Sequence, residues 1–145
     1  MTEPPDQHLG ITELAAICAS MRARNIDLFE RLGGWVIDTP DPDLQRLFAE
    51  ASHLHAWHAE LWAQRAPVIP PAELDNSVAP PSAPSVGASE RATEYGETLD
   101  QLLADLGATR ARIDVLLDPS TARTIKLVAT DLADLRNRIT RGSAT

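Results

Sequence analysis

Apolar side chains recur at alternating spacings of three and four along residues 11–36. An α-helix completes a turn every 3.6 residues, so this pattern places one continuous stripe along one side of a helix. The pattern therefore predicts a first helix over 11–36 that buries one face. The positions expected to face inward are Ile11, Leu14, Cys18, Met21, Asn25, Leu28, Leu32 and Trp35.

A second helix is predicted over 42–65, after a short connection. Asp41 is a favoured cap for a helix N-terminus, and Pro42 suits the first helical position, where its missing N–H is not needed. The inward positions predicted for this helix are Leu44, Leu47, Ala51, Leu54, His58 and Leu61, with Phe48, His55 and Trp62 beside them.

The C-terminal half of the chain repeats this arrangement. Helices are predicted over 89–117 and 119–141, and Asp118–Pro119 punctuates them as a cap followed by a first-turn proline. A shift of 81 positions superposes the inward stripes of the two halves, which indicates a repeated helical hairpin. The inward positions expected here are Ala92, Tyr95, Leu99, Leu102, Leu106, Thr109, Ile113 and Leu116, then Ile125, Val128, Leu132, Leu135 and Ile139.

Residues 66–88 separate the two halves and differ from them in composition. Six prolines in this stretch exclude a continuous helix and favour an extended course. About twenty extended residues at ~3.1 Å each reach farther than a helix of ~35 Å. The sequence therefore predicts a single all-α domain over 1–145, with short flexible termini. Its expected architecture is a four-helix bundle of two antiparallel hairpins joined by a long Pro-rich crossover.

The charge balance narrows the range of partners. The net charge is −8, and such a chain is repelled by nucleic-acid phosphates and by anionic membrane surfaces, so neither is expected as a partner. No apolar run approaches the ~20 residues that a membrane span needs. The lone cysteine, Cys18, has no internal disulfide partner, and the start of the sequence does not resemble a signal peptide. We therefore expect a cytoplasmic protein, and the single lysine among many arginines is typical of a high-GC bacterial genome.

Basic residues gather late in the chain, and acidic residues are interleaved with them, which argues against a polyanion site. The charged runs 90–97 and 136–141 are expected to be solvated helix ends, since their signs suit the helix dipole. The basic residues are Arg110, Arg112, Arg123, Lys126, Arg136, Arg138 and Arg141, and the acidic residues among them are Asp114, Asp118, Asp131 and Asp134.

The predicted layout, together with Glu50 and His53 in a Glu-x-x-His spacing, resembles the ferritin-like superfamily. The resemblance implies a bundle core in which carboxylates and histidines hold two metal ions, so Glu50 and His53 are the candidate ligands for iron or manganese in an oxidase or hydroxylase. Two features point the other way. The fourth helix has Asp131 and Asp134 but no histidine at the equivalent place, and no carboxylate occupies an inward position. We therefore expect no metal cofactor, and an enzyme is the less favoured alternative.

Three polar or reactive side chains, Cys18, Asn25 and His58, fall on the inward stripes of the first hairpin. Buried polar groups cost free energy unless they are hydrogen-bonded, so their presence calls for an explanation. One explanation is a small-ligand site formed by these residues and His55, or a thiol activated by a neighbouring imidazole. The other is structural, with Asn25 fixing helix register and Cys18 acting as a small hydrophobe.

Small residues line the opposite side of the second helix and would allow another helix to approach closely. They form a candidate homodimer surface, and the alternative is that these alanines simply face water. The function expected from the sequence is therefore a metal-free ferritin-like binding or accessory module that forms a homodimer and takes a small ligand or protein partner. A further alternative makes the second helix the docking site for another protein. The dimer-surface residues are Ala49, Ser52, Ala56, Trp57, Ala59 and Ala63.

Overall fold

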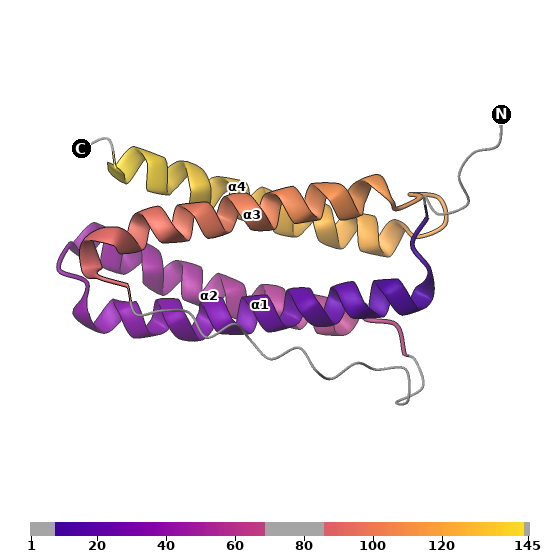
Figure 1. Cartoon of the computed structure of the whole chain (residues 1–145), viewed down its shortest axis with the longest axis horizontal. Helices are drawn as coiled ribbons and strands as arrows, with labels where there is room; N and C mark the ends of the chain where they lie inside the picture. Colours follow the sequence, from indigo (N-terminus) through magenta and orange to yellow (C-terminus); the bar gives the residue numbers. More distant parts are fainter. Residues whose placement is uncertain (1–7, 69–85, 144–145) are drawn as a thin grey trace.

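The computed structural model describes residues 8–68 and 86–143. Four α-helices account for most of them: α1 (Ile11–Asp38), α2 (Pro42–Arg65), α3 (Arg91–Ala111) and α4 (Pro119–Ser143). A single 3₁₀ turn, η2 (Ala88–Glu90), precedes α3. The predicted all-α class is confirmed, and the helices pack as a bundle (Figure 1).

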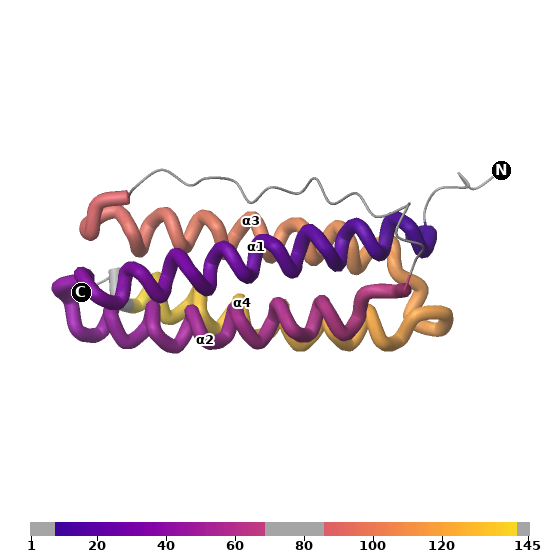
Figure 2. Tube along the Cα trace, turned by 90° about the horizontal axis from the view of Figure 1, so that it is seen from below, coloured from indigo at the N-terminus to yellow at the C-terminus, as the bar shows by residue number. Residues whose placement is uncertain are grey.

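The helices form two layers, with α1 beside α3 in one and α2 beside α4 in the other (Figure 2). Ion pairs join the two helices within each layer. Glu13 pairs with Arg112 at one end of α1 and α3, and Asp38 pairs with Arg91 at the other. In the second layer, Arg65 at the end of α2 pairs with Asp118 just before α4. Neighbouring helices therefore run in opposite directions, while α2 and α3 run in the same direction (Figure 1).

The parallel course of α2 and α3 places the end of α2 and the start of α3 at opposite ends of the bundle (Figure 1). The predicted Pro-rich crossover at 66–88 lies between these two points, and its central part, 69–85, falls outside the described residues. None of the described helices is long and apolar enough to cross a membrane.

Both helix starts that the sequence marked with Asp-Pro begin as predicted. The Asp41 carboxylate accepts hydrogen bonds from the N–H groups of Asp43 and Leu44, and α2 begins at Pro42. The Asp118 carboxylate accepts from the N–H of Thr121 at 3.1 Å, and α4 follows. These bonds satisfy N–H groups that the first helical turn would otherwise leave without a partner.

The inward stripes of α1 and α4 are confirmed by burial. Every predicted inward position of α4 is at most 4% exposed, and every one of α1 except Ile11 is buried. Ile11 lies in the first turn of α1 and is 63% exposed. Periodicity therefore predicts the buried positions of α1 correctly along the helix, but not in its first turn.

The buried face of α2 is rotated from the predicted one. Leu44, Leu54 and Leu61 are only half-buried, whereas the flanking Phe48 and Trp62 are fully buried. The reason is that α2 packs against both α1 and α4, so it needs a wide buried face, and the bulky aromatic side chains occupy its centre.

Helix α3 ends at Ala111, earlier than the Leu117 predicted from the sequence. The Asp114 carboxylate accepts from the N–H of Leu116 at 2.8 Å, and the Asp114 carbonyl accepts from the N–H groups of Leu117 and Asp118. These local bonds replace the helical ones and turn the chain into α4. As a result Leu116, predicted to face inward, is 91% exposed.

Candidate functional site

His55 lies at the centre of the bundle core and links three helices. Its Nδ1 is 2.8 Å from Asn25 Oδ1 on α1, and its Nε2 is 2.6 Å from the Tyr95 hydroxyl on α3. The Asn25 amide nitrogen already donates to the Met21 carbonyl at 2.8 Å, so Asn25 Oδ1 accepts. His55 therefore carries its proton on Nδ1, and its Nε2 accepts from the Tyr95 O–H. Every polar atom of the His55 ring has a partner.

Burial keeps this network neutral. His55 is 0% exposed, and burial, with a smaller effect from His58, lowers its pKa to about 3. Burial likewise raises the pKa of the Tyr95 phenol. A neutral, fully hydrogen-bonded chain of side chains with no access to solvent orders the core, and it offers no free atom to a ligand.

His58 lies one turn further along α2 and faces α4. Its Nε2 is 2.9 Å from Asp131 Oδ2. Burial lowers the pKa of His58, and the Asp131 carboxylate opposes that shift. The rings of His55 and His58 meet edge to face with centroids 6.0 Å apart. The two histidines thus connect α2 to α1, α3 and α4, which is a packing role.

Cys18 does not join this network. The charged groups that act on its thiol are Arg65 and Asp118, at the other end of α2, and not His58. Burial raises the pKa of Cys18 to about 11, which is opposite to what an activated thiol needs. The four predicted ligand-binding residues, Cys18, Asn25, His55 and His58, are each at most 2% exposed. The structure joins Asn25 to His55 by a hydrogen bond and brings the rings of His55 and His58 into contact, and a ligand reaches none of the four without opening the core.

The predicted metal ligands lie on the solvent side of α2. Both Glu50 and His53 are exposed, and the Glu50 carboxylate pairs with Arg138 at 2.6 Å. Among the described residues, no group of three or more His, Cys, Asp or Glu side chains is arranged to hold a metal ion. The residues present therefore do not fit a di-metal centre of the ferritin-like type, because the phase of α2 turns both candidates away from the core.

The row of small residues on α2 is divided between two environments. Ser52 and Ala59 are buried against α1, where the Ser52 hydroxyl donates to the Phe29 carbonyl at 2.7 Å. A Cβ on Gly33 would come within 3.3 Å of Ser52 Oγ, so α1 and α2 approach very closely here. The close approach predicted for a partner copy is used, at these positions, by a helix of the same chain. Ala56 is half-buried, and the exposed members of the row are Ala49, Trp57 and Ala63.

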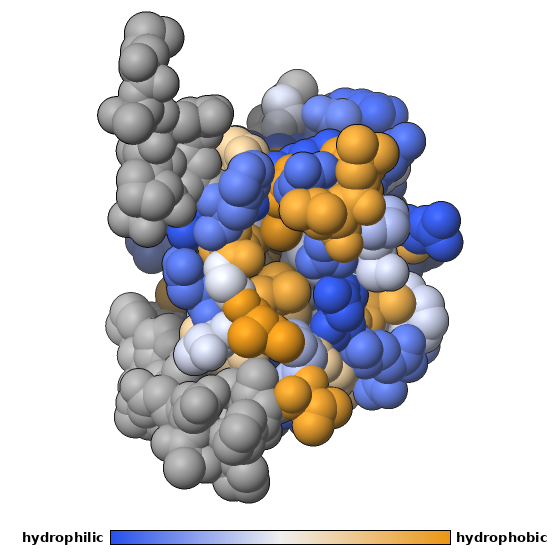
Figure 3. All heavy atoms as spheres, turned by 90° about the vertical axis from the view of Figure 1, so that its right-hand side faces the viewer, coloured by the Kyte–Doolittle hydropathy of each residue, from blue (hydrophilic) through white to orange (hydrophobic). Residues whose placement is uncertain are grey.

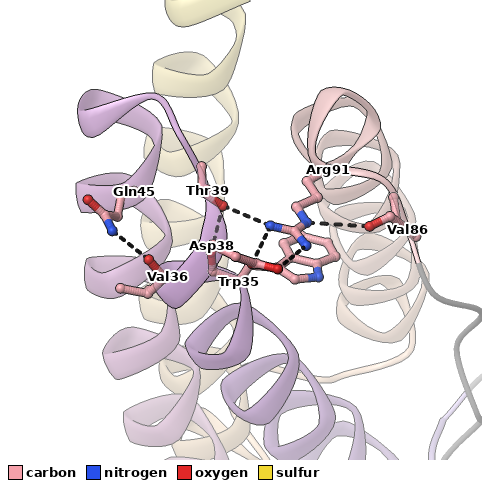
Figure 4. A network of polar contacts seen from close by, with 7 residues as sticks. All are labelled: Trp35, Val36, Asp38, Thr39, Gln45, Val86 and Arg91. Carbon is pink, nitrogen blue, oxygen red and sulfur yellow. Dashed lines mark hydrogen bonds and ion pairs between the residues drawn. The ribbon is translucent and has the colours of Figure 1, made fainter.

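An arginine clamp that the sequence did not reveal joins the end of α1 to the start of α3 (Figure 4). Arg91 is 8% exposed, although it belongs to a charged run expected to be solvated. Its guanidinium contacts both Asp38 carboxylate oxygens, at 2.7 and 3.2 Å, and the Thr39 hydroxyl at 3.1 Å. It also donates to the Val86 carbonyl and lies 5.6 Å from the centre of the Trp35 ring. This buried arginine anchors the start of α3 to the end of α1.

An apolar groove lies between the C-terminal half of α3 and the N-terminal half of α4. Its volume is about 660 Å³. The floor is made of aliphatic side chains and small residues from both helices. They include Leu103, Leu106 and Gly107 on α3, and Ala122, Ile125 and Ala129 on α4.

The groove exists because α3 and α4 lie farther apart than α1 and α2. Small residues bring α1 and α2 together, whereas leucine, isoleucine and valine side chains separate α3 from α4. Small residues at the surface then leave space unfilled: a Cβ on Gly107 would meet no atom within 4 Å. Val115 closes one end, where apolar side chains are exposed at this end of the molecule (Figure 3).

Three cationic side chains line the groove: Arg110 on α3, and Arg123 and Lys126 on α4. All three are exposed, and within the described part of the chain none of them forms an ion pair. The Arg110 guanidinium donates to the Ile113 carbonyl at 3.3 Å, its one side-chain bond to a described residue. The sequence placed these residues in a basic cluster, but the groove beneath them depends on the helix spacing and on the early end of α3.

Comparisons of this chain with protein-family models, with curated proteins and with solved structures find no match. The resemblance to the ferritin-like superfamily therefore rests on the helical layout and on the spacing of Glu50 and His53 alone. The geometry of the chain offers three features that bear on function: a buried polar core, exposed carboxylates, and an apolar groove lined by cations.

Proposed function

We propose that this chain is a metal-free, ferritin-like four-helix bundle that acts as a binding module, with its ligand site in the groove between α3 and α4. The parallel course of α2 and α3 supports the layout, since two consecutive helices that run in the same direction need a connection that returns along the length of the bundle. The neutral, fully bonded His55 network supports a structural core in place of a catalytic one.

The groove is the observation that carries this proposal. Small-molecule sites are concave and mostly apolar, with a few convergent polar groups and volumes of roughly 300–1,000 Å³. The groove has about 660 Å³, an aliphatic floor and three cations beside it. This is a different place from the first hairpin that the sequence suggested, whose polar residues are sealed from solvent.

A neutral apolar fluorescent probe, N-phenyl-1-naphthylamine, tests whether the groove binds ligands. The probe is expected to bind the wild-type protein with one site and a blue-shifted emission. Gly107→Phe should abolish that site, since a helical side chain leans toward the preceding turn and would lie over Leu103 in the groove.

Gly34→Phe is the matched control. Gly34 is also an exposed helical glycine, and a Cβ there also meets no atom within 4 Å, but it lies on α1 away from the groove. This variant should bind the probe as the wild type does. If both variants lose binding equally, or the wild type binds no probe, the groove is not a ligand site.

Metal content tests the other half of the proposal. The exposed positions of Glu50 and His53 predict that tag-free protein contains no stoichiometric iron or manganese and takes up none from added ferrous salt. Elemental analysis by plasma mass spectrometry measures this. Stoichiometric metal would favour the ferritin-like oxidase or hydroxylase and contradict a metal-free module.

A second candidate function is self-association through the solvent side of α2. Trp57 is 48% exposed, and it lies on the same helix as the exposed Ala49 and Ala63. A half-exposed tryptophan on a helix that also exposes small residues favours a helix–helix contact, with a second copy or with another protein. Analytical ultracentrifugation at micromolar concentration should show a dimer that Trp57→Glu converts to monomer. A wild-type monomer at these concentrations would exclude the homodimer.

A further inference from the structure

The charge around the groove is positive, opposite in sign to the net charge of the chain. The protein has a net charge of −8, yet Arg110, Arg123 and Lys126 gather at one groove. Most other arginines of the bundle are matched with acidic groups, such as Arg24 with Asp105, although Arg22 and Arg46 form no ion pair with described residues. The three groove cations therefore keep charge that the described residues do not neutralise.

The acidic groups closest in sequence to the groove have partners of their own. Asp114, beside the lining residue Val115, accepts from the N–H of Leu116. Asp105 pairs with Arg24, and Asp118 pairs with Arg65 while capping α4. Asp131 lines a smaller cleft beside Arg123 and Lys126, but its carboxylate accepts from His58 across the α2–α4 seam. An incoming anion would thus be the counter-ion that the groove cations lack.

The cations stand on both walls of the groove. Arg123 and Lys126 are three residues apart on α4, so they share one helix face. Arg110 lies on α3, opposite them. A compact anionic head between the two helices would therefore be contacted from both sides by charge-assisted hydrogen bonds.

The floor of the groove indicates the chemistry of the remaining part of the ligand. It is aliphatic along its length, from Ala129 at one side to Val115 next to the exposed Leu116 and Leu117. A flexible hydrocarbon chain suits such a narrow aliphatic surface. A nucleic acid has no apolar part to cover it, and the net charge of −8 opposes binding to an extended polyanion or an anionic bilayer.

We propose that the ligand of this groove is a free, single-chain amphiphilic anion, a long-chain carboxylate whose head group lies between Arg110, Arg123 and Lys126 while its tail covers the aliphatic floor. This inference rests on the proposed function, and it names the chemical class that the groove takes. Head and tail are recognised separately, so each can be tested separately.

Isothermal titration with saturated carboxylates of increasing chain length, below their micelle concentrations, tests the tail. The affinity should rise about fourfold for each added methylene until the groove is filled, as expected for burial of a CH₂ group. Each carboxylate should also displace N-phenyl-1-naphthylamine. A flat chain-length series would overturn the proposed placement of the tail.

The double variant Arg123→Gln/Lys126→Gln tests the head group. Carboxylate binding should weaken about tenfold or more, because two charge-assisted contacts are lost, whereas the alcohol of the same chain length should bind unchanged. The matched control is Arg22→Gln/Arg46→Gln, which removes the same charge from two exposed arginines on α1 and α2 that also form no ion pair with described residues. The control should bind the carboxylate as the wild type does.

The outcomes separate this inference from the proposed function. If wild type binds the alcohol as tightly as the carboxylate, or both double variants weaken the carboxylate equally, the anionic class is wrong while the binding module stands. If neither carboxylate nor neutral probe binds, both proposals fail. Binding to phosphatidylglycerol vesicles without binding of monomeric carboxylate would replace the free anion by a membrane surface and overturn the inference.

Discussion

At the residue scale, His55 illustrates how a polar side chain becomes part of a core. Its two ring nitrogens bond to Asn25 and to Tyr95, and the three side chains are at most 2% exposed. The inward position of Asn25 and the flanking position of His55 were predictable from periodicity. Their bond was not, because it depends on how α1 lies against α2 and on a hydroxyl supplied by α3.

We expect His55→Leu to lower the free energy of unfolding by about 2–4 kcal/mol, because Asn25 Oδ1 and the Tyr95 hydroxyl lose their buried partner. The triple variant Asn25→Leu/His55→Leu/Tyr95→Phe should lose less than the single one, since no polar atom is then left unpaired. Urea denaturation measures both. If the triple variant is less stable than His55→Leu, the Asn25–His55–Tyr95 hydrogen bonds contribute more stability than is regained by removing the unpaired polar atoms.

A second residue-scale prediction compares two bidentate Arg–Asp pairs. The Arg91 side chain is 10% exposed where it pairs with Asp38, and the Arg136 side chain is 34% exposed where it pairs with Asp100. Arg136→Met should change the free energy of unfolding by less than about 1 kcal/mol, as is usual for exposed pairs. Arg91→Met should cost more, because it also removes the bonds to Thr39 and Val86.

Thermal unfolding of the two methionine variants measures this difference, and hydrogen exchange locates it. Amides at the start of α3 should lose protection in Arg91→Met and keep it in Arg136→Met. Arg91→Lys should behave like Arg91→Met, since an ammonium cannot reproduce the two-pronged contact with Asp38. Equal effects of Arg91→Met and Arg136→Met would refute the role of Arg91 as an anchor.

At the element scale, the second helix shows where periodicity misleads. The leucines of α2 form a regular stripe, but the helix has neighbours on two sides, and the centre of its buried face passes through Phe48, His55 and Trp62. A helix that contacts one neighbour buries a narrow stripe, whereas one with two neighbours buries a wide face whose centre cannot be read from spacing alone. For the same reason the small residues Ser52 and Ala59 serve the contact with α1.

The adjacent glycines of α1 give a test at this scale. Gly34→Ala should raise the free energy of unfolding by about 0.5–1 kcal/mol, because alanine favours the helix and its Cβ meets no atom within 4 Å. Gly33→Ala should gain less or lose stability, since its Cβ lies 3.3 Å from Ser52 Oγ. Urea denaturation compares the two. Equal stabilisation by both would mean that α1 and α2 are not held as closely as the structure shows.

At the scale of the whole molecule, the bundle is held in register by ion pairs along two seams. Among the described residues, four ion pairs join α1 to α3 and two join α2 to α4, where the hydrogen bond between His58 and Asp131 adds a third contact. The two buried histidines belong to the centre of this assembly. Their protonation therefore affects the stability of the fold as a whole.

The free energy of unfolding should fall as the pH falls from about 6.5 toward 3. Burial lowers the pKa of His55 to about 3 and also lowers that of His58, whereas both groups lie near 6.5 when exposed. Below pH 6.5 the unfolded chain thus binds more protons than the folded one, which destabilises the fold by up to about 1.4 kcal/mol per pH unit for each histidine.

Urea denaturation at pH 7.5, 6, 5 and 4 measures this slope. The hydrogen bond from Arg91 lowers the pKa of Asp38 below 3.8. Desolvation raises the pKa of Asp118, but its bonds to Thr121 and Arg65 outweigh that effect, so this pKa is also lowered from 3.8. The contribution of both carboxylates to the free energy of unfolding is therefore lost only below the pH range of this experiment. The slope between pH 6 and 4 should be shallower in the triple variant that lacks His55. A free energy of unfolding that stays constant from pH 7.5 to 4 would contradict buried neutral histidines.

The sequence alone determined the all-helical class, the Asp-Pro starts of α2 and α4, and the buried stripes of α1 and α4, because caps and periodicity are local properties of the chain. Only the tertiary structure decided which face of α2 is buried and where α3 ends. It also decided that Cys18, Asn25, His55 and His58 are enclosed in the core. These depend on which helices neighbour each other and how closely. The groove beside Arg110, Arg123 and Lys126 arises in the same way, from the spacing of two helices whose side chains differ in size from those of the other pair.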